Sequence, residues 1–161
     1  MTDTSWDRMT YPFTLQQIED EVRKLVAEKG ADYKYEPLPR PEYTTLTEQD
    51  YYGKGSCRYV QYQDPVQREG FCGCIFGWAL NRLGIPMSTL ERVEGVGITQ
   101  AIHHLRLVDP RDLDWDLDGA WAWGGDVQGA QDGHMSWGDA VRYADRLRTG
   151  RRNRALGHGQ H

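Results

Sequence analysis

Apolar residues at helical spacing dominate the chain, and the first such stretch follows a marked helix start. Thr14 and Gln17 stand three residues apart, as the two members of a capping box do, and Phe13 precedes them as one half of a hydrophobic staple. Apolar side chains then recur at helical spacing until Gly30, a residue type that commonly ends helices. The pattern predicts a helix over residues 15–29.

Three shorter helical patterns follow in the middle of the chain. Residues 74–83 carry one apolar stripe, which is closed by a glycine and a proline. Ser88 and Glu91 form a second capping box and predict a short helix that Gly95 ends. The next apolar stripe starts at Ile98. We therefore expect three helices between the centre of the chain and the aspartate-rich segment that follows.

The last third of the chain predicts a helical hairpin. Residues 123–132 and 137–145 carry similar short patterns, and each begins with tryptophan. A glycine-containing turn separates them, which is typical of two antiparallel helices. Ser136 and Asp139 form a third capping box. The final helix is therefore expected at about 137–148.

Two segments lack a helical period. Residues 31–50 contain three prolines and predict an extended strap laid over the core. Residues 57–62, with the sequence CRYVQY, are rich in β-forming side chains and predict a short strand. Tyr51 and Tyr52 are the expected partners of that strand in a small hairpin.

These elements together predict a mainly α fold. We expect a compact helical domain of five or six helices over residues 1–150, with a minor β-strand or hairpin near residues 50–62. The chain has 161 residues, which is long enough to bury a core without disulfide bonds. Residues 151–161 have no apolar period and are rich in arginine, so they are expected to form a flexible basic tail.

The composition indicates the cellular compartment in which the protein acts. No run approaches the roughly 20 apolar residues that span a bilayer, and the start of the chain lacks the order of a signal peptide. Three cysteines is an odd number, and thiols stay reduced in the cytoplasm. We therefore expect a cytoplasmic protein with no membrane partner.

The segment GFCGCIFGWALNRLG raises the question of a nucleophilic cysteine. A thiol at a helix N-terminus gains thiolate character from the helix dipole. Cys72, with Gly84 twelve residues further on, resembles the nucleophile helix of NlpC/P60-type peptidases. That resemblance implies a thiol peptidase or amidase with Cys72 as nucleophile. Those families place the base on a β-sheet, whereas the histidines here fall on a predicted helix and in a turn: His103, His104 and His134.

Two other interpretations of the cysteines stay open. Cys57, Cys72 and Cys74 together with one histidine would form a Cys₃His zinc set, but the paired C-x₂-C motifs typical of such sites are absent. Alternatively, Cys57 and Cys74 are buried apolar groups, which is the most frequent role of unpaired cysteine. The second interpretation is favoured, and no cofactor is predicted.

The aspartate-rich segment resembles the beginning of a calcium-binding loop. Asp114, Asp116 and Asp118 have the alternating spacing of the first three ligands of such a loop. The twelfth position, where a bidentate glutamate is needed, is Gly125. The alternative is a solvated loop whose carboxylates lie near the N-terminus of the next helix.

Arginine is concentrated near the C-terminus, although the formal net charge of the chain is −5. A helical hairpin followed by arginines suggests a helix-turn-helix whose second helix contacts phosphates. The candidate residues for binding a nucleic acid or another partner are Arg142, Arg146, Arg148, Arg151 and Arg152. A nucleic-acid-binding regulator is therefore one alternative function.

Three segments share a pattern with known sequences. They are C-R-Y-V at 57–60, C-I-F-G-W-A-L-N-R-L-G at 74–84 and Q-x-x-Q-D-G-x-x-x-W-G-x-A-V at 128–141. In these segments the chain resembles small uncharacterised proteins of actinobacteriophages and their actinobacterial hosts. The resemblance implies a phage or bacterial cytoplasm. On these grounds we expect a non-enzymatic binding or accessory protein that is phage-encoded and contacts a host protein.

Overall fold

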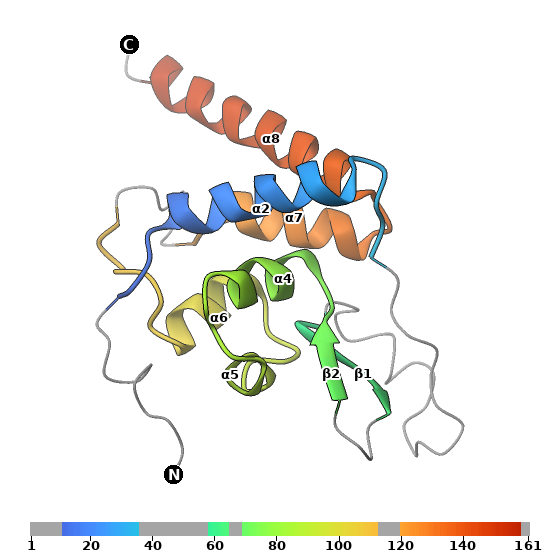
Figure 1. The fold of residues 1–161 in the computed structure, drawn as a ribbon. Coiled ribbons are helices and arrows are strands. Elements are labelled where there is room, and N and C mark those ends of the chain that lie inside the picture. Colours follow the sequence, from blue (N-terminus) through green and yellow to red (C-terminus); the bar gives the residue numbers. More distant parts are fainter. Residues whose placement is uncertain (1–10, 36–57, 65–68, 113–119, 159–161) are drawn as a thin grey trace.

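The computed structural model describes residues 11–35, 58–64, 69–112 and 120–158. Within these ranges the protein is mainly helical, with six helices and one small β-hairpin (Figure 1). The helices are α2 (Leu15–Lys29), α4 (Ile75–Arg82), α5 (Met87–Glu91), α6 (Ile98–His104), α7 (Ala122–Asp132) and α8 (Trp137–His158), and the strands are β1 (Val60–Asp64) and β2 (Glu69–Cys72). The mainly α fold predicted from the sequence is confirmed.

Helix α2 begins and ends where the sequence predicts. The Thr14 hydroxyl accepts the Gln17 N–H at 3.1 Å, and the Gln17 side chain accepts the Thr14 N–H at 2.8 Å. The capping box is therefore complete. Gly30 follows the last turn with φ = 93°, a conformation that favours glycine.

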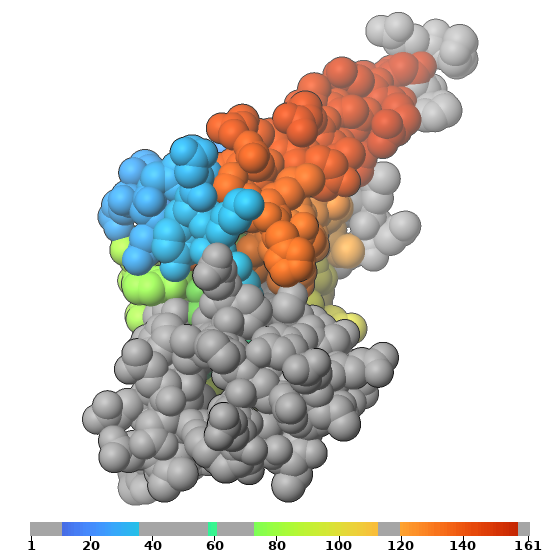
Figure 2. Space-filling view, turned by 90° about the vertical axis from the view of Figure 1, so that its right-hand side faces the viewer, coloured from blue at the N-terminus to red at the C-terminus, as the bar shows by residue number. Residues whose placement is uncertain are grey.

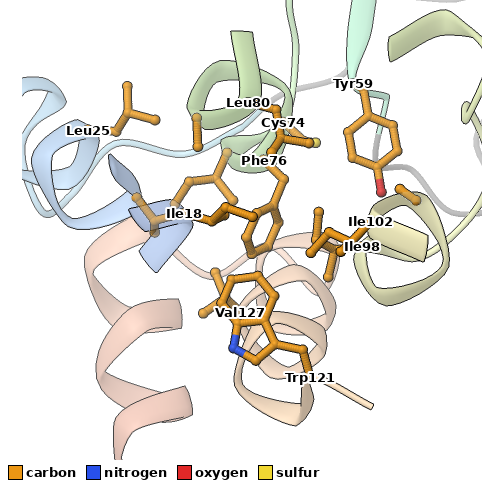
Figure 3. Packing of buried hydrophobic residues seen from close by; sticks show 14 of the residues in the cluster. Ile18, Leu25, Tyr59, Cys74, Phe76, Leu80, Ile98, Ile102, Trp121 and Val127 are labelled. Atoms are coloured by element: carbon orange, nitrogen blue, oxygen red, sulfur yellow. The ribbon is translucent and has the colours of Figure 1, made fainter. Parts of the chain in front are cut away.

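The helices form two groups with the core between them. Figure 1 shows α2, α7 and α8 side by side, with α4, α5, α6 and the hairpin next to them. Phe76 of α4 lies at the centre, and its ring meets that of Trp121 edge-on at 5.7 Å. Around it, the side chains of Ile18, Ile102 and Val127 converge from α2, α6 and α7 (Figure 3). Burial of these apolar side chains is the main stabilising contribution to the fold.

The hairpin differs in part from the prediction. β1 begins at Val60 and pairs antiparallel with β2, whose last residue, Cys72, lies opposite Val60. The sequence did not predict β2. The expected partners Tyr51 and Tyr52 lie outside the described residues.

The described start of the predicted strap contacts α8. The carbonyls of Ala31 and Tyr33 accept the N–H groups of Gly138 and Trp137, at 3.0 and 2.8 Å. The ring of Tyr33 lies 4.4 Å from that of Trp137, and Tyr35 is buried. This segment therefore fixes the first turn of α8. Residues 36–50 lie outside the described part of the chain.

Two helix ends predicted from the sequence are wrong. α5 starts after Pro86 and has no side-chain cap, so Ser88 is not its N-cap. α8 was expected to end near residue 148, but it continues to His158 and replaces the flexible tail expected at 151–161 over most of its length. In the ranges that the structure describes, no helix has the length and apolar character needed to cross a bilayer.

Candidate interaction surface of α7 and α8

α7 uses its inner face to hold the starts of two other helices. Oε1 of Gln131 accepts the N–H of Ile75 at the start of α4, and Oε1 of Gln128 accepts the N–H of Ile98 at the start of α6, both at 2.8 Å. Neither helix has a cap from its own N-cap side chain. The amide of Gln128 also donates to the Tyr59 hydroxyl at 3.2 Å. The two glutamines thus accept hydrogen bonds from backbone N–H groups at the starts of α4 and α6, which have no acceptor within those helices.

The outer side of α7 forms an open groove with α8 and the turn between the two helices. The groove has a volume of about 330 Å³. We call it the α7 groove and define it by its lining residues: Gly125, Asp126, Gly129, Ala130, Gly133, Met135 and Tyr143. Met135 is 39 % exposed and is one of two exposed large apolar side chains among the described residues.

Two glycines of the α7 groove make no close packing contact with the described part of the chain. A Cβ atom at Gly125 or Gly129 would meet no neighbouring side chain or segment within 4 Å, and neither residue has a positive φ. By contrast, a Cβ at Gly124 would lie 2.4 Å from Cε3 of Trp121. A glycine inside a helix costs about 1 kcal/mol relative to alanine. Packing among the described residues therefore requires glycine at 124 but not at 125 or 129.

Ion pairs attach α8 to α2. Glu19 of α2 is buried and accepts from Arg23 at 3.0 Å and from Arg148 at 2.6 Å. Arg23 also reaches Asp145 at 2.7 Å, and the indole N–H of Trp123 donates to the same carboxylate. Although burial acts in the opposite direction, these hydrogen bonds hold the pKa of Asp145 below its ordinary value. The network fixes α8 beyond the point at which its apolar pattern ends.

The structure divides the five arginines predicted to bind a nucleic acid or another partner. Arg148 and Arg151 are only 16 % and 15 % exposed and pair with Glu19 and with Asp126 of α7, the latter at 2.9 Å. Arg142 pairs with Asp139 within α8. Arg146 and Arg152 are exposed. Two of the predicted binding residues therefore serve the attachment of α8 to the body of the protein.

The cysteine segment offers a buried thiol at the start of α4. Cys74 is the N-cap of this helix and is fully buried. Its N–H donates to the carbonyl of Arg58 at 2.8 Å, and the next N–H, that of Ile75, is taken by Gln131. These amides are therefore engaged within the fold. Cys72 ends β2, and its side chain lies outside the described part of the structure, as does the whole of Cys57.

The remaining candidate ligands do not assemble in the part of the chain that can be described. His103 and His104 are exposed at the end of α6, and His134 lies in the turn between α7 and α8 with φ = 73°. Within the described ranges no group of three or more histidine, cysteine, aspartate or glutamate side chains could hold a metal ion. Asp114, Asp116 and Asp118 fall outside those ranges.

The sequence interpretation did not identify the α7 groove. A signal is present, because Gly125 and Gly129 lie four residues apart on one face of α7, and Gly133 follows four residues later at the end of that helix. Comparisons with protein-family models, with curated proteins and with solved structures found no match to the chain.

Proposed function

We propose that the protein acts by binding another protein in the α7 groove, and not by catalysis. The setting proposed from the sequence pattern is that of a phage-encoded accessory protein that contacts a host protein in the host cytoplasm. The proposal of a phage origin and a host partner is supported only by the resemblance of the three sequence segments. The proposal of a binding surface is supported by the contacts of α7.

The observation that carries the proposal is the presence of Gly125 and Gly129 at the open face of a helix. Each lowers the stability of α7 by about 1 kcal/mol relative to alanine, and no packing contact within the described chain compensates for it. Glycine on a helix face allows a second backbone to approach closely, because no side chain separates the two. A partner that lies along α7 would use this property.

The shape and lining of the α7 groove favour a protein partner over a small molecule. Small-molecule sites bury most of the ligand surface in an enclosed cleft, whereas this groove is open along one side of a helix. Met135 and Tyr143 supply apolar area at its edge. Methionine adapts its shape to a partner, and tyrosine contributes contact area with little loss of side-chain entropy.

The proposal is tested by filling the groove. We would capture proteins from an actinobacterial lysate with immobilised wild-type protein, with the Gly129→Leu variant and with the Ala155→Leu variant as control. Gly129→Leu places a large side chain in the groove at a position where a Cβ atom meets no neighbour within 4 Å, and Ala155→Leu adds the same group at an exposed position of α8. We expect one protein to be retained by the wild type and the control but not by Gly129→Leu.

A photo-reactive phenylalanine analogue in place of Met135 locates the contact. It should cross-link to the captured protein, while the same analogue in place of the exposed Leu156 should not. Retention of the same protein by all three baits would show that it binds elsewhere. If no protein is retained specifically by the wild type, the proposed function is wrong.

A further inference from the structure

The C-terminal end of α8 carries positive charge without any compensating acid of its own. After Asp145 the sequence contains no aspartate or glutamate. Arg146, Arg152 and Arg154 are exposed on this part of the helix. Since Arg148 and Arg151 are paired with acids of α2 and α7, these three exposed arginines make up the outward charge.

This end of the helix extends beyond the body of the protein. Figure 1 shows α8 continuing past α2 and α7, and Figure 2 shows it leaving the packed helices at one corner of the molecule. Residues 152–157 are all exposed. From Arg146 to His158 the helix is about 20 Å long at 1.5 Å per residue. It therefore presents several of its sides to a partner at once.

The projecting end lacks the features of a helix that binds a protein groove or a lipid surface. Such helices carry an apolar stripe along one face. Here the one large apolar side chain that is well exposed is Leu156, at 70 %. A positively charged helix without an apolar face is suited to bind a polyanion, because the surface of a polyanion is charged along its whole length.

We propose that the projecting end of α8, with Arg146, Arg152 and Arg154, binds the phosphate backbone of double-stranded DNA. The major groove of B-DNA is about 12 Å wide and admits an α-helix. Arginine presents a planar set of donors that matches phosphate oxygens. Phosphate contacts of this kind carry no sequence information, so binding is independent of DNA sequence.

This surface is separate from the α7 groove and does not depend on the protein-binding function. It also differs from the set of five arginines expected from the sequence, because Arg148 and Arg151 are used inside the fold. Arg154 was absent from that set, and the extension of α8 to His158 brings it onto the projecting helix.

The experiment is a fluorescence-anisotropy titration of a labelled DNA duplex of mixed sequence at low salt, starting near 50 mM. It compares the wild type with a triple variant carrying Arg146→Gln, Arg152→Gln and Arg154→Gln. A control variant carries Lys24→Gln, Lys34→Gln and Arg111→Gln, which removes the same charge at exposed positions of the body. Glutamine is nearly as good a helix former as arginine, so α8 is retained, and circular dichroism verifies this.

We expect the wild type and the control to bind with similar affinity, and the α8 variant to lose most of the binding. For three phosphate contacts, the slope of log K against log salt concentration is about −2.7, and it approaches zero in the α8 variant. Absence of wild-type binding at low salt, or equal loss in both variants, overturns the proposal. If polyglutamate competes as well as unlabelled duplex, the surface recognises acidic protein chains and the DNA proposal is wrong.

Discussion

On its inner side α7 places Gly124 against the indole of Trp121, whereas on its outer side Gly125 and Gly129 face open space. The inner side also holds the starts of α4 and α6 through two buried glutamines. Glycine therefore allows close packing within the chain on the inner side of α7, and leaves the helix surface uncovered on the outer side. The difference separates the part of α7 that determines the fold from the part available to a partner.

We expect the largest loss of stability from substitutions of buried glycines at which an added Cβ atom would collide with the backbone or with a buried ring. At Gly77 of α4 it would lie 2.1 Å from the carbonyl oxygen of Tyr59, and at Gly124 it would meet the buried Trp121 ring. Gly77→Ala should lower the free energy of unfolding by about 3 kcal/mol or more, and Gly124→Ala by about 1–3 kcal/mol. Urea unfolding monitored by circular dichroism measures both changes. A wild-type midpoint in either variant would show that the inner glycines are not required.

The next effect concerns the glutamine caps. Gln131→Ala leaves the buried N–H of Ile75 without its acceptor, so we expect a loss of about 1–3 kcal/mol in the free energy of unfolding. Gln16→Ala, at an exposed position of α2, is the matched control and should change stability by less than about 0.5 kcal/mol. Equal losses in the two variants would contradict the capping role.

A smaller, pH-dependent effect is expected at Glu94, which holds the hairpin by accepting the N–H of Val60 at 2.9 Å. Burial raises the pKa of the Glu94 carboxyl from 4.5 to about 7, although backbone hydrogen bonds and Arg58 act in the opposite direction. Because the folded state binds this proton more tightly, the contribution is present below pH 4.5 and is lost as the pH rises to about 7.

The variant Glu94→Gln tests this pH dependence. The amide oxygen can still accept the Val60 N–H, so the variant should fold, but its stability should fall less between pH 4.5 and 7 than that of the wild type. Asp20→Asn removes a carboxylate at an exposed position of α2 that does not act on the pKa of Glu94, and serves as control. The account of Glu94 fails if both variants keep the wild-type slope. Burial also raises the pKa of Asp132 to about 6, so some slope is expected to remain.

Local signals in the sequence predicted much of the fold. The capping box of Thr14 and Gln17 and the stop at Gly30 act within one helix, and α2 has the predicted bounds. The same kind of signal failed at Ser88, because the turn after Pro86 already starts the helix. Capping residues predict that a helix exists more reliably than where it begins.

Contacts between distant residues decided what the sequence could not predict. The end of α8 has no apolar period, yet Arg148 pairs with Glu19, 129 positions away, and Arg151 pairs with Asp126. Gln131 caps a helix that starts 56 positions earlier. In the candidate surface, the four-residue spacing of Gly125 and Gly129 is visible in the sequence. Which side of α7 is open depends on the packing of the whole chain.

The central claim is that Gly125 and Gly129 of the α7 groove do not serve the fold, and the unfolding free energy of the Gly129→Ala variant tests it most directly. Urea unfolding should show a gain of up to about 1 kcal/mol over the wild type, because alanine favours the helix and meets no neighbour. The Gly125→Ala variant should behave alike. A loss of stability in either variant would show that the fold itself requires these glycines, and would contradict the claim.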